Sequence, residues 1–145
     1  MGVSDLQLEV RSDPRMLGLI RTVVHDWVDG FEIPHEVVHD VVLAIDEACS
    51  NVIRHAYEGR PDGMLELRMR AEPEFLEFEV IDQGVPCPAE CHERGPLQQP
   101  ESTELEPGGL GLHLIKKVFD EIVFCPGKEL GNCVTMRLRR VKDEE

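Results

Sequence analysis

The stretch from Val41 to Tyr57 constrains the fold more than any other part of this chain. Apolar residues recur around it at spacings of three and four, typical of one buried helical face, at Val38, Val41, Ile45, Ala48, Val52 and Ala56. Four more apolar residues widen this face into a broad arc, namely Val37, Val42, Cys49 and Ile53. The pattern predicts a long central helix, opened by Pro34, with most of its surface inside the protein.

Two polar residues, Glu47 and Asn51, lie four positions apart at the edge of this apolar arc. That spacing stacks their side chains one helical turn apart. A carboxylate and a carboxamide at the edge of a buried helix are costly to desolvate unless something binds them. For these two residues alone, a solvated stripe beside a core face is the simpler interpretation. Motifs further along the chain favour a binding site instead.

The remaining hydrophobic pattern predicts strands and helices on both sides of the central helix. Alternation of apolar and polar residues predicts strands at 6–10, 65–71, 76–80, 122–124 and 133–138. A helical period predicts two more helices, at 14–30 and 112–119, the first introduced by a capping side chain in Ser12-Asp13-Pro14. Counting by twos from Val80 places Asp82 on the buried face of its strand, on the side where the helices pack.

Segment 83–107 is the one long stretch without a regular pattern, and it contains five prolines. A loop of this length in a compact domain is usually a functional lid or disordered. It leads into Gly108-Gly109-Leu110-Gly111. Glycines before a helix can be a flexible joint, or they can expose backbone N–H groups that bind an anion.

Composition limits the classes of protein and partner. A chain of 145 residues fits one domain, 1–145. The formal net charge of −14 argues against binding to nucleic acid or to an anionic membrane surface. No apolar run is long enough to span a membrane, and no signal peptide is apparent. The five irregularly spaced cysteines do not resemble a disulfide framework, so we expect a reduced, cytoplasmic protein.

Three motifs in this order resemble the ATP-binding domains of the GHKL superfamily, which includes gyrase-type ATPases, MutL-type ATPases and sensor histidine kinases. The N box of its small anti-sigma-factor serine kinases is similar to Asp46-Glu47-Ala48-Cys49-Ser50-Asn51-Val52-Ile53-Arg54-His55-Ala56-Tyr57-Glu58. Their first glycine box is similar to Asp82-Gln83-Gly84-Val85-Pro86. Their second is similar to Gly108-Gly109-Leu110-Gly111-Leu112-His113-Leu114-Ile115. The resemblance covers nearly the whole chain.

The resemblance implies a role for each motif. Glu47 would be the general base toward a serine hydroxyl, and Asn51 would ligate Mg²⁺. Asp82 would accept a hydrogen bond from the adenine amino group. The other nucleotide contacts would come from Gly84, which leaves room for the base, and from Gly108, Gly109, Leu110, Gly111, Leu112 and Thr135.

The resemblance also implies a fold and partners. The fold is an α/β two-layer sandwich of the Bergerat type, with helices on one face of a mixed, mostly antiparallel sheet and segment 83–107 as ATP lid. The expected function is ATP-dependent phosphorylation of an anti-anti-sigma-type protein, together with sequestration of a sigma factor. The alternatives are a nucleotide-dependent module that binds its partner with little or no transfer, and a detached histidine-kinase catalytic domain. Because relatives use the neighbouring surface for dimer contacts, Trp27 could contribute to a homodimer interface.

The sequence departs from the family pattern in the lid. Some relatives carry an arginine before the second glycine box that meets the terminal phosphate, but no Lys or Arg lies between Arg94 and Lys116. Either of these two residues could supply the missing charge. Cys87, Cys91 and His92 also lie close together in this segment, but they lack the second ligand pair of a strong zinc site.

Overall fold

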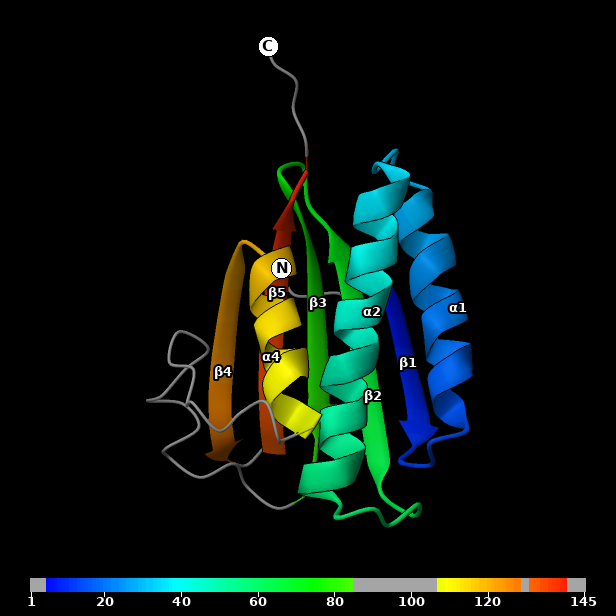
Figure 1. Ribbon diagram of the computed structural model, residues 1–145, viewed down its shortest axis with the longest axis vertical. Helices are drawn as coiled ribbons and strands as arrows, with labels where there is room; N and C mark the ends of the chain where they lie inside the picture. The colour runs from blue at the N-terminus through cyan, green and yellow to red at the C-terminus, as the bar shows by residue number, and fades with distance from the viewer. Residues whose placement is uncertain (1–4, 85–106, 129–130, 141–145) are drawn as a thin grey trace.

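The computed structural model describes residues 5–84, 107–128 and 131–140, in which three helices cover one face of a five-stranded sheet (Figure 1). The strands lie in the order β1-β2-β3-β5-β4. In chain order the elements are β1 (Leu6–Arg11), α1 (Met16–Asp29), α2 (His35–Asn51), the π-helical turn η1 (Val52–Ala56), β2 (Met64–Ala71), β3 (Phe75–Asp82), α4 (Pro107–Val118), β4 (Glu121–Lys128) and β5 (Gly131–Arg139). The two-layer α/β architecture is therefore confirmed.

All strand pairings in the described part of the sheet are antiparallel. The sheet was expected to be mixed, but no parallel pair occurs among the described strands. The β2–β3 pair is joined by a short turn at Glu72, whose N–H donates to the Phe75 carbonyl over 2.8 Å. The strictly alternating burial along β3 gives the sheet one covered and one open face.

The core lies between the covered face of the sheet and the helices. The buried residues of α2 are Val38, Val41, Ile45, Ala48 and Cys49 of the apolar arc, together with Ala44, which lies outside the arc predicted from the sequence. On the sheet, Phe78 is fully buried, and Trp27 of α1 packs edge-on against its ring with centroids 5.9 Å apart. Trp27 thus contributes to the core, whatever the assembly of the protein.

The central helix does not stay α-helical up to Tyr57. It changes at Asn51 into the π-helical turn η1, in which the N–H of Tyr57 reaches the carbonyl of Val52 over 3.1 Å. The N–H of Gly59 then bonds the Ile53 carbonyl over 2.8 Å and ends the turn. Short π-helical turns inside helices are rare and occur frequently at functional sites.

Of the two polar residues in Ser12-Asp13-Pro14 that could cap α1, Ser12 does not do so. Its side chain is fully buried, and its hydroxyl donates to the Arg60 carbonyl at 2.6 Å and accepts the Gly63 N–H at 2.9 Å. The carboxylate of Asp13 accepts the Arg15 N–H at 2.9 Å at the start of α1 instead. Ser12 therefore fixes the connection between η1 and β2, a contact between distant segments that local sequence rules do not reveal.

Two boundaries in the second half of the chain differ from the expectation. Helix α4 begins at Pro107, so the glycine cluster forms its first turns and does not precede them. Strand β4 continues through Pro126 and Gly127 to Lys128, with a register shift between Cys125 and Lys128. A proline has no N–H for the ladder, so an irregularity at that point accommodates it inside a strand.

Candidate functional site

Four chain segments meet at one end of the molecule, the lower end in Figure 1. Strand β3 ends there and β5 begins there, while α2 passes into η1 and α4 starts beside it. The motifs predicted to act together lie on these segments. The antiparallel pairing of β3 with β5 and the packing of α2 against α4 therefore bring them to a common region.

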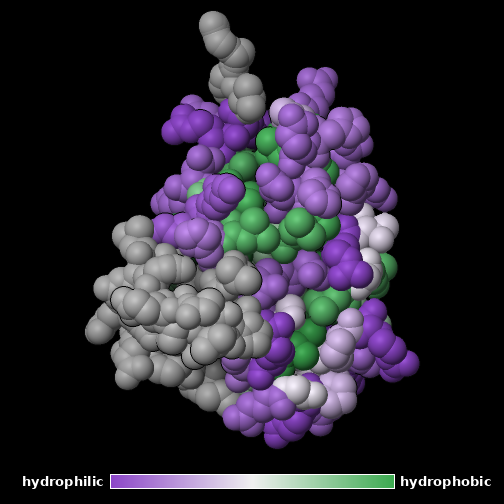
Figure 2. Space-filling view, viewed as in Figure 1, coloured by the Kyte–Doolittle hydropathy of each residue, from purple (hydrophilic) through white to green (hydrophobic). Residues whose placement is uncertain are grey.

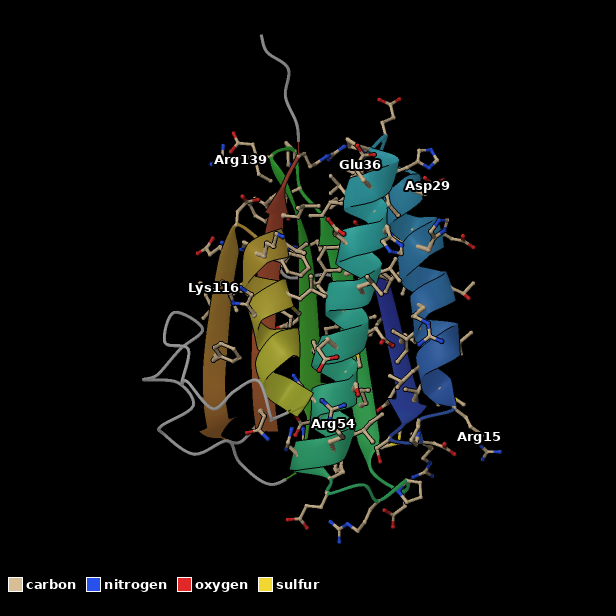
Figure 3. The ribbon with its side chains drawn as sticks, in the orientation of Figure 1. Arg15, Asp29, Glu36, Arg54, Lys116 and Arg139 are labelled. Carbon is tan, nitrogen blue, oxygen red and sulfur yellow. The ribbon has the colours of Figure 1, made fainter. Side chains whose placement is uncertain are left out.

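Glu47 and Asn51 are joined by an arginine that follows them on the same stripe of the helix. The Nη2 atom of Arg54 donates to Glu47 Oε2 at 3.0 Å and to Asn51 Oδ1 at 2.6 Å. Its Nη1 atom donates to the Ser50 hydroxyl at 2.6 Å. Figure 3 shows Arg54 at the end of the helix, next to the first turns of α4. We call these four residues the Arg54 cluster.

Asp82 is a buried carboxylate at the last position of β3, with an exposed fraction of 4%. This confirms its expected orientation toward the helices. Its Oδ1 atom accepts hydrogen bonds from Asn132 Nδ2 and from the Gly84 N–H, each at 2.8 Å. Burial raises the pKa of Asp82 above its ordinary value of 3.8, although both hydrogen bonds act in the opposite direction. Neither of these bonds uses the second carboxylate oxygen, Oδ2.

Asn132 is the residue of this site that the sequence analysis missed. It lies opposite Asp82 in the β3–β5 register, 50 positions along the chain, and is nearly as buried. The expected contact, Thr135, pairs with Glu79 on the open face of the sheet. Since side chains alternate along a strand, the structure does not bring Thr135 together with Asp82. An Asn directly after the glycine that begins β5 carries no signal in the sequence without the register of the strands.

Gly84 and Tyr57 dock the end of β3 onto η1. A Cβ atom at Gly84 would lie 2.3 Å from the carbonyl oxygen of Ala56, far closer than packing allows. The Tyr57 hydroxyl accepts the Gln83 N–H at 2.8 Å and donates to the Met64 carbonyl at 2.6 Å. The helical motif and the strand motif are thereby held against each other. The contact with Ala56 of η1 is by itself a sufficient reason for a glycine at position 84.

The glycine cluster is located only through its backbone. Gly108, Gly109, Leu110, Gly111 and Leu112 all belong to the first turns of α4. The N–H groups at a helix start have no intrahelical partner, which is the property that suits such a position to an anion. The rest of the predicted lid, with Arg94 and the Cys87, Cys91 and His92 group, lies outside the described residues.

Lys116, the other candidate for the missing lid charge, does not lie near the Arg54 cluster. Figure 3 shows it on the flank of α4 that faces away from α2, whereas Arg54 is at the helix end. Among the described residues, no group of three or more His, Cys, Asp and Glu side chains could hold a metal ion. In the same ranges, no helix is long and apolar enough to cross a membrane.

The sequence profile of the histidine kinase-like ATPase domain matches residues 10–138, which is most of the chain. The chain belongs to this family. It is 28% identical to the serine-protein kinase RsbW of Bacillus pumilus over 122 residues, covering 81% of this chain and 75% of that one. Similarity to RsbW of Bacillus subtilis is 27% over 120 residues, with the same coverage of 81% and 75%.

Solved structures support the same fold. A Mycobacterium tuberculosis chain with RsbU and RsbW domains superposes with a TM-score of 0.58 at 17% identity, over 92% of this chain and 32% of that one. The catalytic domain of the histidine kinase ThkA superposes with a TM-score of 0.57 at 14% identity, over 92% and 97% of the two chains. This chain therefore spans about a third of the solved mycobacterial chain and nearly all of the ThkA domain.

The site of this ATPase domain contains suitable groups for a nucleotide and a hard cation. Asn51 offers a neutral carboxamide oxygen, a ligand type that Mg²⁺ accepts. The buried carboxylate of Asp82 is held on one oxygen by two donors, which orients the other for a further donor. The backbone N–H groups at the start of α4 complete the set of groups that this structure places at the common end.

Proposed function

We propose that this protein is an ATP-dependent serine protein kinase of the anti-sigma-factor type. The family supports use of ATP, and relatives named serine-protein kinases support the class of reaction. The observation that carries the proposal is the location of Glu47 and Asn51, joined through Arg54, at the same end of the domain as the buried Asp82. These three residues supply a candidate general base, a candidate metal ligand and a residue that could recognise adenine.

Each residue has a separate role in nucleotide binding. The Asp82 carboxylate accepts a hydrogen bond from the amino group of adenine. Guanine is excluded because it presents a carbonyl at that position. Asn51 ligates Mg²⁺, and the N–H groups in the first turn of α4, those of Gly108 and Gly109, bind phosphate oxygens. ATP supplies the phosphoryl group, and Mg²⁺ offsets the charge on its phosphates.

Glu47 acts as the base. A carboxylate one turn before the metal ligand can accept the proton of a serine hydroxyl as that oxygen attacks phosphorus. Its side chain is 24% exposed, so a substrate can reach it while the helix still limits its orientation. The Arg54 guanidinium at 3.0 Å keeps the carboxylate directed along the stripe that also contains Asn51.

The protein substrate is an anti-anti-sigma-type protein, and the second partner is a sigma factor that the kinase sequesters. Partner switching of this kind would regulate transcription in the cytoplasm without direct contact to nucleic acid. The net charge of −14 agrees with that arrangement, because nucleic acid and anionic membranes would repel the protein. A homodimer remains a prediction.

The deciding experiment measures transfer from radiolabelled ATP to serine-containing partner candidates encoded beside this protein. We expect labelling of a partner serine by the wild type. Glu47→Gln should retain most ATP affinity, since the amide has nearly the same shape, and should lower the rate of transfer by roughly 10²–10⁴-fold.

Glu36→Gln is the matched control, because Glu36 lies at the opposite end of α2 (Figure 3). This variant should transfer phosphate at the wild-type rate. A Glu47→Gln protein with full activity would exclude Glu47 as the base.

A binding module without phosphotransfer is the second candidate. The sequence supports it because positions 95–115 contain no Lys or Arg to meet a terminal phosphate. It predicts that the wild type binds ATP and its partner but never labels a serine. In that case Glu47→Gln should leave ATP-dependent partner binding unchanged.

A further inference from the structure

In the Arg54 cluster, the positively charged guanidinium group contacts the same Asn51 oxygen that the proposed function assigns to Mg²⁺. Nη2 of Arg54 lies 2.6 Å from Asn51 Oδ1, the one oxygen that the Asn51 side chain possesses. The same nitrogen lies 3.0 Å from Glu47 Oε2. The guanidinium therefore bridges the proposed metal ligand and the proposed base at the same time.

A metal ion and this guanidinium cannot share Asn51 at these distances. Mg²⁺ binds oxygen at about 2.0–2.1 Å and demands near-ideal octahedral geometry. With both cations on one oxygen, their charges would be separated by only about 4 Å, where like charges repel strongly in a partly buried site. Binding of the metal to Asn51 therefore requires that Arg54 leave Oδ1.

The bonding of Arg54 makes such a displacement feasible. Its Nε atom is buried and has no hydrogen-bond partner in the described part of the chain. A buried donor without a partner is unfavourable, so this conformation does not satisfy every donor of the guanidinium. The side chain is also 36% exposed, which leaves it free to move away from the helix surface.

We propose that Arg54 is a positioning residue that binds Asn51 Oδ1 and the Glu47 carboxylate until Mg²⁺ takes its place on Asn51. Because one nitrogen contacts both Asn51 and Glu47, loading of the metal site changes the contacts of the base carboxylate. The base is then freed only when the metal has bound. This inference rests on the proposed function, since it requires that Asn51 ligates Mg²⁺.

The test titrates Mg²⁺ into protein that has been mixed with a fluorescent, non-hydrolysable ATP analogue. The measured quantity is the Mg²⁺ concentration that gives half of the full binding signal. Arg54→Gln removes the competing charge, so this concentration should fall about fivefold or more. Arg54→Lys keeps the charge at the same helix position, and its half-saturating concentration should stay within about twofold of the wild type.

Arg21→Gln is the control. It removes a comparable ion pair, with Arg21 Nη1 at 2.9 Å from Asp46 Oδ1, that does not involve Asn51. Its Mg²⁺ requirement should equal that of the wild type. If Arg54→Gln does not fold, as judged by circular dichroism, Ser50→Ala serves instead. This variant removes the 2.6 Å anchor of Nη1 and should lower the requirement in the same direction, by a smaller factor.

Two results would overturn the inference. An unchanged or higher Mg²⁺ requirement in Arg54→Gln would show that Arg54 does not compete with the metal. Weaker binding of the analogue by Arg54→Gln in EDTA would show that the guanidinium contacts the nucleotide directly. If the wild type binds the analogue in no condition, the proposed function fails together with the inference, whereas binding with an unaltered Mg²⁺ requirement rejects the inference alone.

Discussion

At the scale of single residues, the site combines buried groups that are unfavourable for the stability of the fold. Asp82 is a carboxylate with an exposed fraction of 4%, and its burial raises the pKa. Arg54 retains a buried Nε without a partner among the described residues. A carboxyl group with a perturbed pKa, such as Asp82, is typical of functional sites.

The first prediction at this scale concerns Asp82→Asn. The amide would present a donor where adenine also presents one, and the charged hydrogen bond would be lost. Such a bond contributes about 1.5–3 kcal/mol, so ATP affinity should fall at least about tenfold in calorimetric titration. Asp29→Asn, at the exposed end of α1, is the control and should bind like the wild type. Unchanged affinity in Asp82→Asn would remove this residue from the adenine site.

The difference in stability between the wild type and Asp82→Asn should depend on pH. An acid whose pKa is raised by folding binds more protons in the folded state, so the free energy of unfolding falls as pH rises through that pKa. The ionised form of Asp82 is therefore unfavourable at neutral pH. Without ligand, Asp82→Asn should melt no lower than the wild type at pH 7.5, and any advantage should disappear as the pH falls toward 3.8. Scanning calorimetry at several pH values checks this expectation.

At the scale of the elements, the change from α2 to η1 determines how the site is assembled. The π-helical turn directs Tyr57 toward the end of β3, where its hydroxyl accepts the Gln83 N–H at 2.8 Å. The ring of Tyr57 leaves no space at Gly63, where a Cβ would lie 2.4 Å away. Contacts this close leave no room for a side chain at position 63, so the turn tightly defines the distance between helix and sheet.

The prediction for this scale is that Gly84→Ala destabilises the fold and displaces Asp82. The new methyl carbon would lie 2.3 Å from the carbonyl oxygen of Ala56, and a backbone atom cannot yield as a flexible side chain can. Overpacking of this kind typically costs about 1–3 kcal/mol, and we expect a lower melting temperature together with weaker ATP binding. Gly18→Ala in α1 is the control.

At Gly18 the nearest atom is the end of the Arg21 side chain at 3.6 Å, and alanine favours the helix. This control should melt at or above the wild-type temperature. Equal melting temperatures for Gly84→Ala and the wild type would mean that η1 does not constrain the end of β3.

At the scale of the whole molecule, the sheet has two different faces. The helices cover one face, and the surface they present is mainly hydrophilic with apolar side chains visible between the polar ones (Figure 2). The open face carries a chain of ion pairs across the strands, in which Glu77 Oε1 lies 3.0 Å from both Arg70 Nη2 and Arg137 Nε. Cross-strand charge pairs of this kind stabilise the register of the strands.

Ligand binding should stabilise the whole domain. At about 100 times its dissociation constant, a ligand that binds only the folded state adds about 2.7 kcal/mol to the free energy of unfolding. For a domain of this size, Mg²⁺ with ATP should therefore raise the melting temperature by roughly 5–10 °C. EDTA should remove part of this increase in the wild type.

With Mg²⁺ and ATP, the melting temperature of Asn51→Ala should rise only as much as that of the wild type does in EDTA, since Asn51 is the expected Mg²⁺ ligand. GTP should stabilise the wild type less than ATP does, because Asp82 selects the adenine amino group. An increase that EDTA does not change would contradict the assignment of Mg²⁺ to Asn51.

The sequence by itself determined the features that depend on local periodicity. The period of the apolar arc placed α2 in the core, and alternation from Val80 placed Asp82 on the buried face. Side-chain direction in helices and strands follows from backbone geometry, so neighbouring residues are sufficient to establish it. The motif order likewise indicated the family, which the sequence profile confirms.

Only the tertiary structure decided which distant groups meet. The pairing of Asp82 with Asn132 depends on the register of β3 with β5, and the same register places Thr135 on the open face. Arg54 was visible on its stripe, but its bonds to Glu47 and Asn51 depend on the rotamer that packing around η1 allows. Register and rotamer are set by contacts across the whole fold, and the sequence of one segment therefore cannot specify them.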